Sequence, residues 1–478
     1  MSKHLLRLVQ SGSTLYDFQD PAYAVTSSWK IAVYDNTKTC VEDKLVINPT
    51  GSSITTFLNN LNTLHRAIMT GNDNYNQWRD GFPYTPVFLQ FKQDGQENVL
   101  QSEFLGGNTG EVENYLAGAL RAKIIPNLEL TLKRRPYWEE TSDQTLGGAS
   151  SVSNDGGYYE LSGVRGDLES PLSISVTAAT TNQDRVIIGC KARGTVANFV
   201  NKYQAEGYTA RYTTGSSVAD LVAGTEPNFS PGTGTVGQRW TVNTTSDVTL
   251  LSWDITANVA DQLGTYRVFV RCRDNNSTFN VKIRVRAGVY TSGSSKQYGD
   301  YGDIYKYGDG TGTGGGTNSS PGTTAVPLID CGIISLPPVD TQGKTPGRMI
   351  IELHAKADST SGSPTFDVDY LILMPLYELP FQNGYVIADF PVDLGNSTTP
   401  TGIVTSKDRT PRAYLDASGT LQYSASQLRG NPLLVWNNKT VRVFVMTQRT
   451  SNLRHTYGIN NSVTITATPR YRLPGRGS

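Results

Sequence analysis

Residues 53–69 read Ser-Ile-Thr-Thr-Phe-Leu-Asn-Asn-Leu-Asn-Thr-Leu-His-Arg-Ala-Ile-Met, the one convincing helix in the sequence. Ser52 or Ser53 can cap its first turn, and Gly71 stands where a left-handed residue would end the last turn. The spacing therefore predicts an amphipathic helix whose apolar stripe lies on a sheet formed by its sequence neighbours. The predicted stripe consists of Ile54, Phe57, Leu58, Leu61, Leu64, Ile68 and Met69.

The composition is that of many short strands joined by turns. A chain of 478 residues is long enough for about three domains. Only 18% of the residues are charged, while Gly (47) and Tyr (25) are abundant. Lys plus Arg equals Asp plus Glu at 42 each, so no global field attracts nucleic acid or an anionic membrane. We therefore predict a mainly β protein without nucleic-acid specificity.

No segment of the sequence predicts a membrane span, a metal site or a catalytic centre. The N-terminus lacks the apolar run of a signal peptide, so we expect synthesis in the cytoplasm. No later segment approaches the roughly 20 apolar residues of a membrane span. The four cysteines, at positions 40, 190, 272 and 331, form no CxxC pair, and whether they form disulfides stays open. The four histidines lie in no Gly-x-Ser-x-Gly or His-Glu-x-x-His motif, so we expect no enzyme, no cofactor and no metal.

The pattern of strand and turn signals predicts three consecutive domains. Residues 1–140 read as a β-sheet domain with one packed helix. Residues 141–375 contain many short strands with Gly-rich turns, which favours a jelly-roll β-sandwich, with a flexible loop at 290–325. Residues 376–478 read as a C-terminal β domain whose last ten residues are loosely held.

The sharpest charge pattern lies on two neighbouring predicted strands. Basic and apolar residues alternate along 266–273 and again along 280–287, and 274–278 would join the two strands as a hairpin. Such a hairpin brings six cations to one face, where like charges repel. The face therefore needs an acidic partner protein, an anionic ligand such as a surface glycan, or wide exposure to solvent, and these alternatives stay open. The six residues are Arg267, Arg271, Arg273, Lys282, Arg284 and Arg286.

Other polar and aromatic residues give weaker signals. Asp367 and Asp369 point to one face of their predicted strand, where they are solvated or bind a cation or a sugar hydroxyl. Three Tyr-Gly-Asp repeats in 298–309 form a solvated tether or a weak calcium site. Five aromatic residues of predicted loops can stack on sugar rings, edge the core or anchor an interface. They are Tyr158, Tyr159, Tyr208, Tyr212 and Trp240.

Each predicted domain carries motifs that resemble one family. The first combines the helix with Pro86-Val-Phe-Leu and with Leu128-Glu-Leu-Thr-Leu-Lys-Arg-Arg-Pro-Tyr-Trp. The second ends with Phe366-Asp-Val-Asp-Tyr-Leu-Ile-Leu-Met-Pro, and the third carries Asn431-Pro-Leu-Leu and Val463-Thr-Ile-Thr-Ala-Thr-Pro-Arg-Tyr. Together these motifs resemble tailed-bacteriophage tail proteins of the distal tail kind, which are adapters at the tail tip or baseplate.

The resemblance implies a structural protein of the virion. It implies a homo-oligomeric ring, commonly a hexamer, that links the tail tube to host-recognition components and contacts other phage tail proteins. The inserted jelly roll would face outward, and whether it binds host surface polysaccharide, a neighbouring tail protein or nothing stays open. The alternative is a receptor-binding adhesin or tail tube protein whose jelly roll binds host polysaccharide. A polysaccharide-degrading enzyme is a third hypothesis, with only the sandwich in its favour.

Overall fold

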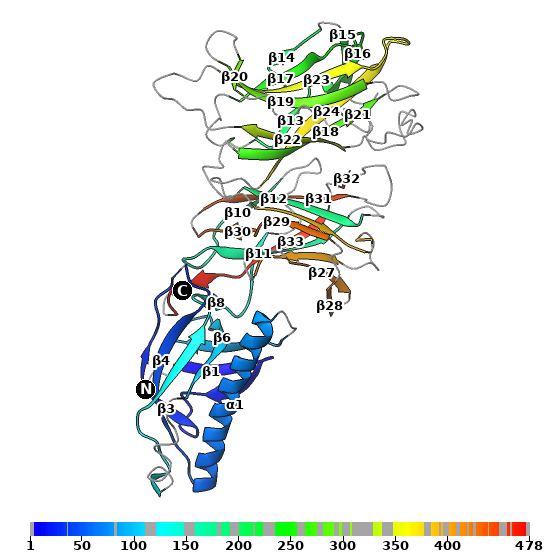
Figure 1. Ribbon diagram of the computed structural model, residues 1–478. Helices are drawn as coiled ribbons and strands as arrows, with labels where there is room; N and C mark the ends of the chain where they lie inside the picture. Colours follow the sequence, from blue (N-terminus) through cyan, green and yellow to red (C-terminus); the bar gives the residue numbers. More distant parts are fainter. Residues whose placement is uncertain are drawn as a thin grey trace. The chain divides into compact units, whose positions relative to one another are not determined.

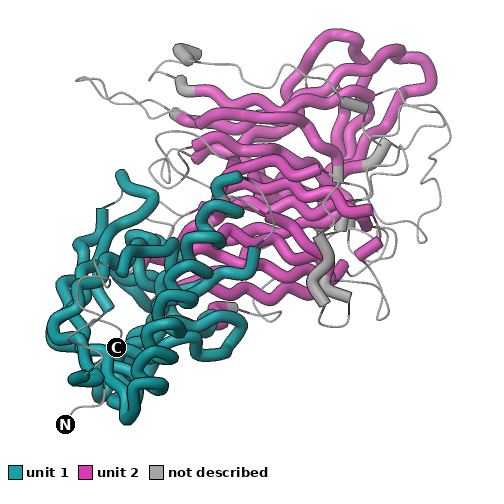
Figure 2. Tube along the Cα trace, turned by 60° about the horizontal axis from the view of Figure 1, so that its bottom comes forward, with its two compact units in different colours: residues 1–144, 164–170, 468–478 teal, residues 145–163, 171–467 magenta. Residues whose placement is uncertain are grey.

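The protein folds into two compact units, each formed from separate stretches of the chain. Unit 1 contains Met1–Gln144, Val164–Ser170 and Thr468–Ser478, and unit 2 contains Thr145–Gly163 and Pro171–Ala467 (Figure 2). Both ends of the chain therefore belong to unit 1. The computed structural model describes residues 4–35, 37–80, 84–109, 121–147, 158–178, 183–191, 200–213, 216–222, 235–255, 262, 264–274, 281–290, 296–298, 306–307, 328–336, 348–376, 384–391, 393–394, 401–407, 412–417, 420–423, 427–437, 439–448, 457–458 and 461–474.

Unit 1 is a nine-stranded sheet packed against one long helix, α1 (Figure 1). The strand order is β2-β1-β5-β6-β7-β4-β3, with β8 pairing with β6 and β34 with β8. Buried and exposed residues alternate along β4 and β7, as expected for strands with one solvated face. The strands are β1 (Leu5–Gln10), β2 (Ser13–Asp17), β3 (Ala24–Lys30), β4 (Val41–Pro49), β5 (Val87–Lys92), β6 (Leu100–Asn108), β7 (Leu128–Arg134), β8 (Trp138–Glu140) and β34 (Arg470–Tyr471).

The helix α1 spans Ile54–Arg79, ten residues beyond the predicted end at Met69. Its N-cap is as predicted, since the Oγ of Ser53 accepts a hydrogen bond from the backbone N–H of Thr56 at 3.0 Å. Phe57, Leu64 and Ile68 of the predicted stripe are buried in the core of unit 1. Its other members Ile54, Leu58 and Met69 are exposed, so the stripe is wider than the face that the sheet covers.

Gly71 does not end the helix, because its role is close packing. A Cβ atom at this position would lie 2.5 Å from Cδ1 of Phe104 in β6. The next residue, Asn72, fastens the helix to the same strand. Its Oδ1 accepts from the N–H of Gly107 at 2.9 Å, and its Nδ2 donates to the carbonyl of Gly107 at 3.3 Å. A glycine that permits close helix–sheet contact looks, in sequence, like a helix terminator.

Unit 2 begins with a sandwich of two sheets, named here after their central strands. The β12 sheet has the order β10-β31-β12-β25-β29, with β32 on β31, and the β11 sheet has the order β28-β27-β26-β11-β33-β9, with β30 on β11. Their strands are β9 (Gln144–Gly147), β10 (Tyr159–Leu161), β11 (Ser170–Thr177), β12 (Arg185–Lys191), β25 (Gly384–Asp389), β26 (Thr401–Thr405), β27 (Arg412–Ala417), β28 (Thr420–Tyr423), β29 (Gln427–Gly430), β30 (Leu434–Val435), β31 (Val441–Gln448), β32 (Tyr457–Gly458) and β33 (Ser462–Ala467).

A second sandwich of unit 2 is built from two further sheets. The β24 sheet has the order β15-β16-β24-β18-β22, with β13 on β24, and the β23 sheet has the order β14-β17-β23-β19-β20, with β21 on β19. Their strands are β13 (Lys202–Gln204), β14 (Ala210–Arg211), β15 (Ser216–Val222), β16 (Thr235–Val242), β17 (Val248–Asp254), β18 (Gly264–Asp274), β19 (Val281–Tyr290), β20 (Lys296–Tyr298), β21 (Lys306–Tyr307), β22 (Leu328–Leu336), β23 (Arg348–Ala357) and β24 (Thr365–Pro375).

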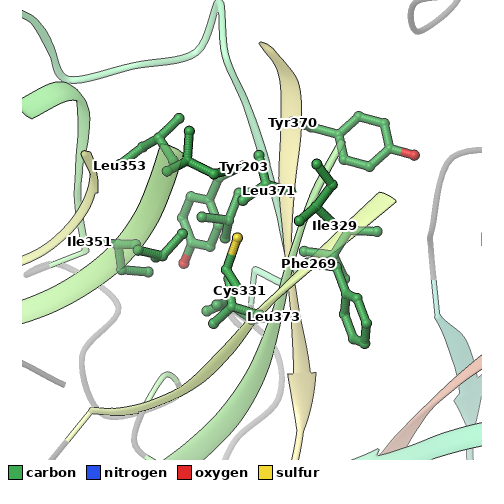
Figure 3. Close-up of a cluster of buried hydrophobic side chains, with 14 of the residues drawn as sticks. Tyr203, Phe269, Ile329, Cys331, Ile351, Leu353, Tyr370, Leu371 and Leu373 are labelled. Atoms are coloured by element: carbon green, nitrogen blue, oxygen red, sulfur yellow. The ribbon is translucent and has the colours of Figure 1, made fainter. Parts of the chain in front are cut away.

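The β24 sheet is buried on both faces. Leu371 and Leu373 point toward Ile351 and Leu353 of the β23 sheet, while Phe269 lies on the opposite side (Figure 3). On that opposite side, a Cβ atom at Gly189 of β12 would lie 2.7 Å from Cγ of Met374. The same core cluster includes Ile187, Tyr385, Ile387, Phe444 and Met446 of the β12 sheet. Burial on both faces explains why the second half of β24, residues 370–375, is an apolar run without alternation.

The two sandwiches are nested in the chain. Strands β12 and β25 are antiparallel neighbours, with Cys190 opposite Gly384, and every strand of the second sandwich lies between them in sequence. The predicted boundaries at 140 and 375 group β10, β11 and β12 with the central sandwich. In the structure these strands pair with β25, β26, β31 and β33 from the C-terminal part of the chain. Pairings of this sequence separation leave no local signal.

The predicted fold class is confirmed: the protein is mainly β, with several sheets and the single helix α1 among its described elements. The prediction of a loosely held C-terminus is wrong for residues 469–474, since Arg470 and Tyr471 are buried and pair with β8. The predicted loop 290–325 lies outside the described residues except for 290, 296–298 and 306–307. In the described chain, no helix has both the length and the apolar character to traverse a bilayer.

Replacing Gly71 with Ala should destabilise unit 1 by about 1–3 kcal/mol, because the added methyl group overlaps the Phe104 ring. At a solvated helix position the same change would stabilise by about 1 kcal/mol. Asn59→Ala, on the exposed side of α1, is the control, with an expected gain below about 1 kcal/mol. Denaturant unfolding of the purified chain measures both changes. A stable Gly71→Ala protein would contradict the packing account.

Candidate functional site: a polar sheet face in the second sandwich

The structure divides the six predicted cations between two sheets. Strand β18 pairs with β22 and β24, whereas β19 pairs with β20, β21 and β23. The predicted hairpin of β18 and β19 is therefore wrong. In a sandwich, consecutive strands commonly cross from one sheet to the other, and charge alternation along a strand does not reveal its neighbour. Arg267, Arg271 and Arg273 belong to the β24 sheet, and Lys282, Arg284 and Arg286 to the β23 sheet.

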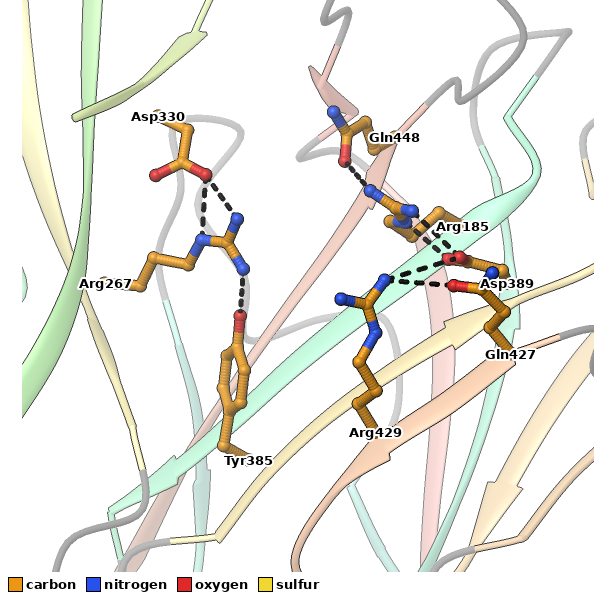
Figure 4. Close-up of polar contacts among 8 residues, drawn as sticks. All are labelled: Arg185, Arg267, Asp330, Tyr385, Asp389, Gln427, Arg429 and Gln448. Atoms are coloured by element: carbon orange, nitrogen blue, oxygen red, sulfur yellow. Dashed lines mark hydrogen bonds and ion pairs between the residues drawn. The ribbon is translucent and has the colours of Figure 1, made fainter. Parts of the chain in front are cut away.

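Arg267 contributes to the packing of the β24 sheet on the β12 sheet. It forms an ion pair with Asp330 of β22, and its Nη1 donates to the hydroxyl of Tyr385 in β25 at 2.9 Å (Figure 4). Burial alone would lower the pKa of Arg267, but the hydrogen bonds and charge of Asp330 outweigh this effect and raise it. Burial also raises the pKa of Tyr385, partly offset by Arg267. Arg267 is thus a structural cation rather than an open ligand site.

A second polar cluster lies on the β12 sheet alone. Arg185 forms an ion pair with Asp389, and its Nη1 donates to Oε1 of Gln448 at 3.1 Å (Figure 4). Arg429 reaches the same carboxylate at 4.0 Å and donates to Gln427 at 3.2 Å. These contacts connect β12, β25, β29 and β31, so they stabilise the sheet.

The two predicted solvated acids of β24 are buried. Oδ2 of Asp369 forms an ion pair with Nη1 of Arg271 at 3.0 Å. The Arg271 guanidinium also lies over the Tyr370 ring, 5.5 Å from its centre. Asp367 binds both Nε and Nη2 of Arg239, at 2.6 and 2.8 Å. Both aspartates are completely buried, so the prediction that they face solvent is wrong. The side chain of Arg273 lies outside the described residues.

The remaining three cations share one side of the β23 sheet with residues of β23. Arg284 stands opposite His354 and Arg286 opposite Glu352 in the register of β19 and β23. Asp247, just before β17, forms ion pairs with Arg284 and, at 3.9 Å, with Arg286. Lys282 pairs with Asp358 at 2.8 Å. We name this set the β23 polar face: Asp247, Lys282, Arg284, Arg286, Glu352 and His354.

His354 is the centre of the β23 polar face. Its Nδ1 lies 3.0 Å from Oδ2 of Asp247, and its Nε2 lies 3.1 Å from Oε2 of Glu352. The imidazole ring therefore bridges two carboxyl groups, one on each ring nitrogen. Sequence analysis gave His354 no role, because one of its partners, Asp247, lies 107 residues earlier in the chain.

For the predicted cations whose side chains are described, the structure shows acidic partners. Each of the five whose side chains are described has a carboxylate within 4.0 Å: Arg267 with Asp330, Arg271 with Asp369, Lys282 with Asp358, and Arg284 and Arg286 with Asp247. These partners come from the same chain, whereas the sequence analysis considered a partner protein. A role in binding an anionic ligand stays a prediction.

The predicted sugar-stacking aromatic residues occupy different environments. Trp240 lies in β16 and is completely buried, so it belongs to the core. Tyr158 lies under the Arg442 guanidinium at 4.0 Å, and Tyr208 lies near that of Arg211 at 5.3 Å. Tyr212 is 37% exposed, and its hydroxyl is 3.4 Å from Oγ of Ser252, which stands opposite Glu352 of the β23 polar face. Tyr212 is therefore the aromatic residue placed to extend that face.

Metal-ligand chemistry has little support in the part of the chain that is described. There, no three His, Cys, Asp or Glu side chains gather in a way that could hold a metal ion. All four cysteines are free thiols, and burial raises the pKa of Cys190 to about 12. The aspartates of the Tyr-Gly-Asp repeats lie outside the described residues.

A second candidate surface, on unit 1, was not found from the sequence. Six of the eight exposed large apolar side chains among the described residues belong to unit 1. Three lie on the helix, two lie in or just after the edge strand β3, and one lies near the C-terminus. They are Ile54, Leu58, Met69, Val25, Val33 and Leu473. The helical periodicity detected three of them but assigned them to the core.

Comparisons with known proteins identify no family. No protein-family model matches the chain, and no curated protein matches it. One similar solved structure is the N-terminal CBM22-1-CBM22-2 tandem domain of Paenibacillus barcinonensis Xyn10C, at 12% identity and a TM-score of 0.21, covering 61% of this chain and 100% of that one. Another is infectious bursal disease virus Gt strain, at 8% identity and a TM-score of 0.17, covering 70% and 80%. At these TM-scores neither similarity carries an argument about function.

Replacing Asp247 with Asn should destabilise unit 2 by about 1–3 kcal/mol, because Arg284, Arg286 and His354 lose the carboxylate that they share. Asp358→Asn is the matched control. That carboxylate pairs with Lys282 and is 38% exposed, so its loss should cost less than about 1 kcal/mol. Thermal unfolding of the two variants measures the difference. Equal shifts would show that Asp247 does not organise the β23 polar face.

Proposed function

We propose that the protein is a structural component of a phage tail, which assembles through unit 1 into a ring at the tail tip or baseplate. The observation that carries this proposal is the concentration of exposed apolar side chains on unit 1. Val33 is 76% exposed and Ile54 is 51% exposed. Exposed large apolar side chains of this kind are candidates for a surface that another protein covers.

The sheet of unit 1 offers edges through which copies could join. Strands β3 and β2 lie at the two ends of the strand order, so each has a single strand neighbour in the sheet. An edge strand can pair with a strand of another chain through its backbone. Val25 lies in β3, and Val33 lies three residues after the end of β3 at Lys30. If β3 of one copy pairs head to tail with β2 of the next, a ring forms when the rotation between successive copies brings the last copy back to the first.

The nesting of the chain supports an adapter role. Unit 1 holds both chain ends, and unit 2 is carried between its segments. An assembly made by unit 1 can therefore carry the sandwiches of unit 2 as an appendage. Under this proposal the protein is made in the host cytoplasm and resides in the virion. Its partners are other copies of itself and other tail proteins, with the hexamer taken from the family resemblance.

A second candidate function is adhesion to host surface polysaccharide through unit 2. Tyr212 favours it, because this 37% exposed aromatic residue lies next to Ser252, which stands opposite Glu352 of the β23 polar face. Sugars are commonly bound by such mixtures of hydrogen-bonding groups and an aromatic face. Ring assembly and adhesion are compatible in one protein.

The variant Val33→Asp should assemble at least about tenfold more weakly than the natural chain, because a charge is placed in the covered surface. Ile333→Asp, at a 50% exposed position of β22 in unit 2, is the matched control and should assemble normally. Light scattering over a concentration series, with electron microscopy of the particles, measures assembly. A natural chain that stays monomeric at high concentration would refute the proposal.

If unit 2 is an adhesin, the chain should bind members of a host-polysaccharide array, and Tyr212→Ala with Arg286→Gln should weaken that binding at least about tenfold. Arg429→Gln removes a 62% exposed cation of the other sandwich and should leave binding unchanged. An array without signal would leave only the structural role.

A further inference from the structure

We infer that the C-terminal strand β34 completes unit 1 and fixes the edge through which the protein assembles, so that chains lacking a docked C-terminus do not join the ring. The inference rests on the proposed assembly through unit 1. It concerns how that assembly is controlled, and every contact used below lies within unit 1.

The backbone of the C-terminal segment is bound from two sides. On one side, Arg470 and Tyr471 pair with Glu139 and Trp138 of β8, and the N–H of Glu140 donates to the carbonyl of Pro469 at 3.1 Å. On the other side, the N–H groups of 167 and 168 both donate to the carbonyl of Arg470, at 2.9 and 3.1 Å. The segment is thus held between β8 and residues 164–170.

A glycine makes the second contact possible. Gly166 has φ +100°, and a Cβ atom there would lie 2.9 Å from the backbone nitrogen of Arg470. The neighbouring Asp167 accepts the N–H of Arg472 at 2.7 Å through Oδ1. Residues 164–170 therefore form a seat shaped for the C-terminal segment. This short stretch is separated from the rest of unit 1 in sequence by residues of unit 2.

The side chains of Arg470 and Tyr471 are buried and paired. Arg470 lies over the Tyr137 ring at 3.9 Å and reaches Glu139 at 3.6 Å. The hydroxyl of Tyr471 donates to Oε1 of Glu140 at 2.6 Å, and Arg165 donates to the other oxygen at 2.6 Å. Burial and then the hydrogen bond to Glu140 raise the pKa of Tyr471, so it remains a donor. Without the segment, the buried Glu140 would lose one of these two donors.

A continuous set of contacts leads from this strand to the proposed assembly edge. Trp138, opposite Tyr471, packs edge-on against Trp29 of β3 at 5.8 Å. The Arg134 guanidinium lies 4.6 Å above the Trp138 ring and binds Asp43 at 2.8 Å.

The last contacts of this set fix the chain just before Val33. Asp43 accepts the N–H of Ala32 at 2.8 Å, and Arg134 donates to the carbonyl of Ala32 at 3.2 Å. Both backbone groups of Ala32 are therefore held by the ion pair of Asp43 and Arg134, and Arg134 packs against Trp138. Loss of Tyr471 would remove packing beside Trp138 and loosen this arrangement.

The order of synthesis gives this arrangement a consequence. Tyr471 follows Glu140 by 331 residues, so unit 1 cannot close until all of unit 2 has been made. Domains commonly fold as the chain emerges, from the N-terminus onward. Here an interrupted chain would contain most of unit 1 without its final strand. Weak assembly of such chains would keep incomplete subunits out of the ring.

The test uses the full chain with Tyr471→Ala, and Arg472→Ala as the matched control. Arg472 is exposed, and its contact with Asp167 uses its backbone N–H, so its side chain should not matter. We expect Tyr471→Ala to assemble at least tenfold more weakly in light scattering. Amide hydrogen exchange of residues 29–34 should become at least tenfold faster in the same variant, and should stay unchanged in Arg472→Ala.

The outcomes separate this inference from the proposed function. If the natural chain assembles, Val33→Asp does not, and Tyr471→Ala assembles like the natural chain, the inference is overturned while the proposed function stands. If the natural chain never assembles, both fail. Should Tyr471→Ala not fold, Tyr471→Phe removes only the hydroxyl group. Faster exchange at residues 29–34 with weaker assembly in that variant supports the inference, and unchanged values of both overturn it.

Discussion

The ion pair of Arg134 and Asp43 is the constraint on which unit 1 depends. Both side chains are completely buried, and Arg134 donates to Asp43 through Nε and Nη2. It also donates hydrogen bonds to the carbonyls of Ala32 and Arg135, and its guanidinium lies over the Trp138 ring. Removing one member of such a pair commonly costs about 3–5 kcal/mol, because the other charge stays buried. The pair therefore fixes the register of β4 and β7 and the position of the chain that leaves β3.

Sequence patterns predicted what depends on local periodicity. The N-cap at Ser53, the buried side chains Phe57, Leu64 and Ile68, and the mainly β fold with one helix follow from residue spacing alone. They failed where one residue type serves two purposes. Gly71 was interpreted as a terminator, whereas it admits the Phe104 ring.

The candidate site could be predicted only in part, because its members meet through distant pairings. Alternation along β18 and β19 identified the cations, and the need for acidic partners was expected from their mutual repulsion. The sequence did not identify those partners, because Asp247, Asp330 and Asp369 come from other parts of the chain. Likewise nothing near Arg470 in sequence indicates its burial beside Tyr137, more than 300 residues earlier in the chain.

The neighbouring positions of β12 and β25 have an evolutionary consequence. Cys190 and Gly384 stand opposite each other in β12 and β25. The chain therefore leaves the β12 sheet and returns to it at two points about 5 Å apart. Any domain whose own termini lie close together could occupy that gap without disturbing the pairing on either side. Exchange of the second sandwich by recombination would then leave the strand pairings of the β12 sheet intact.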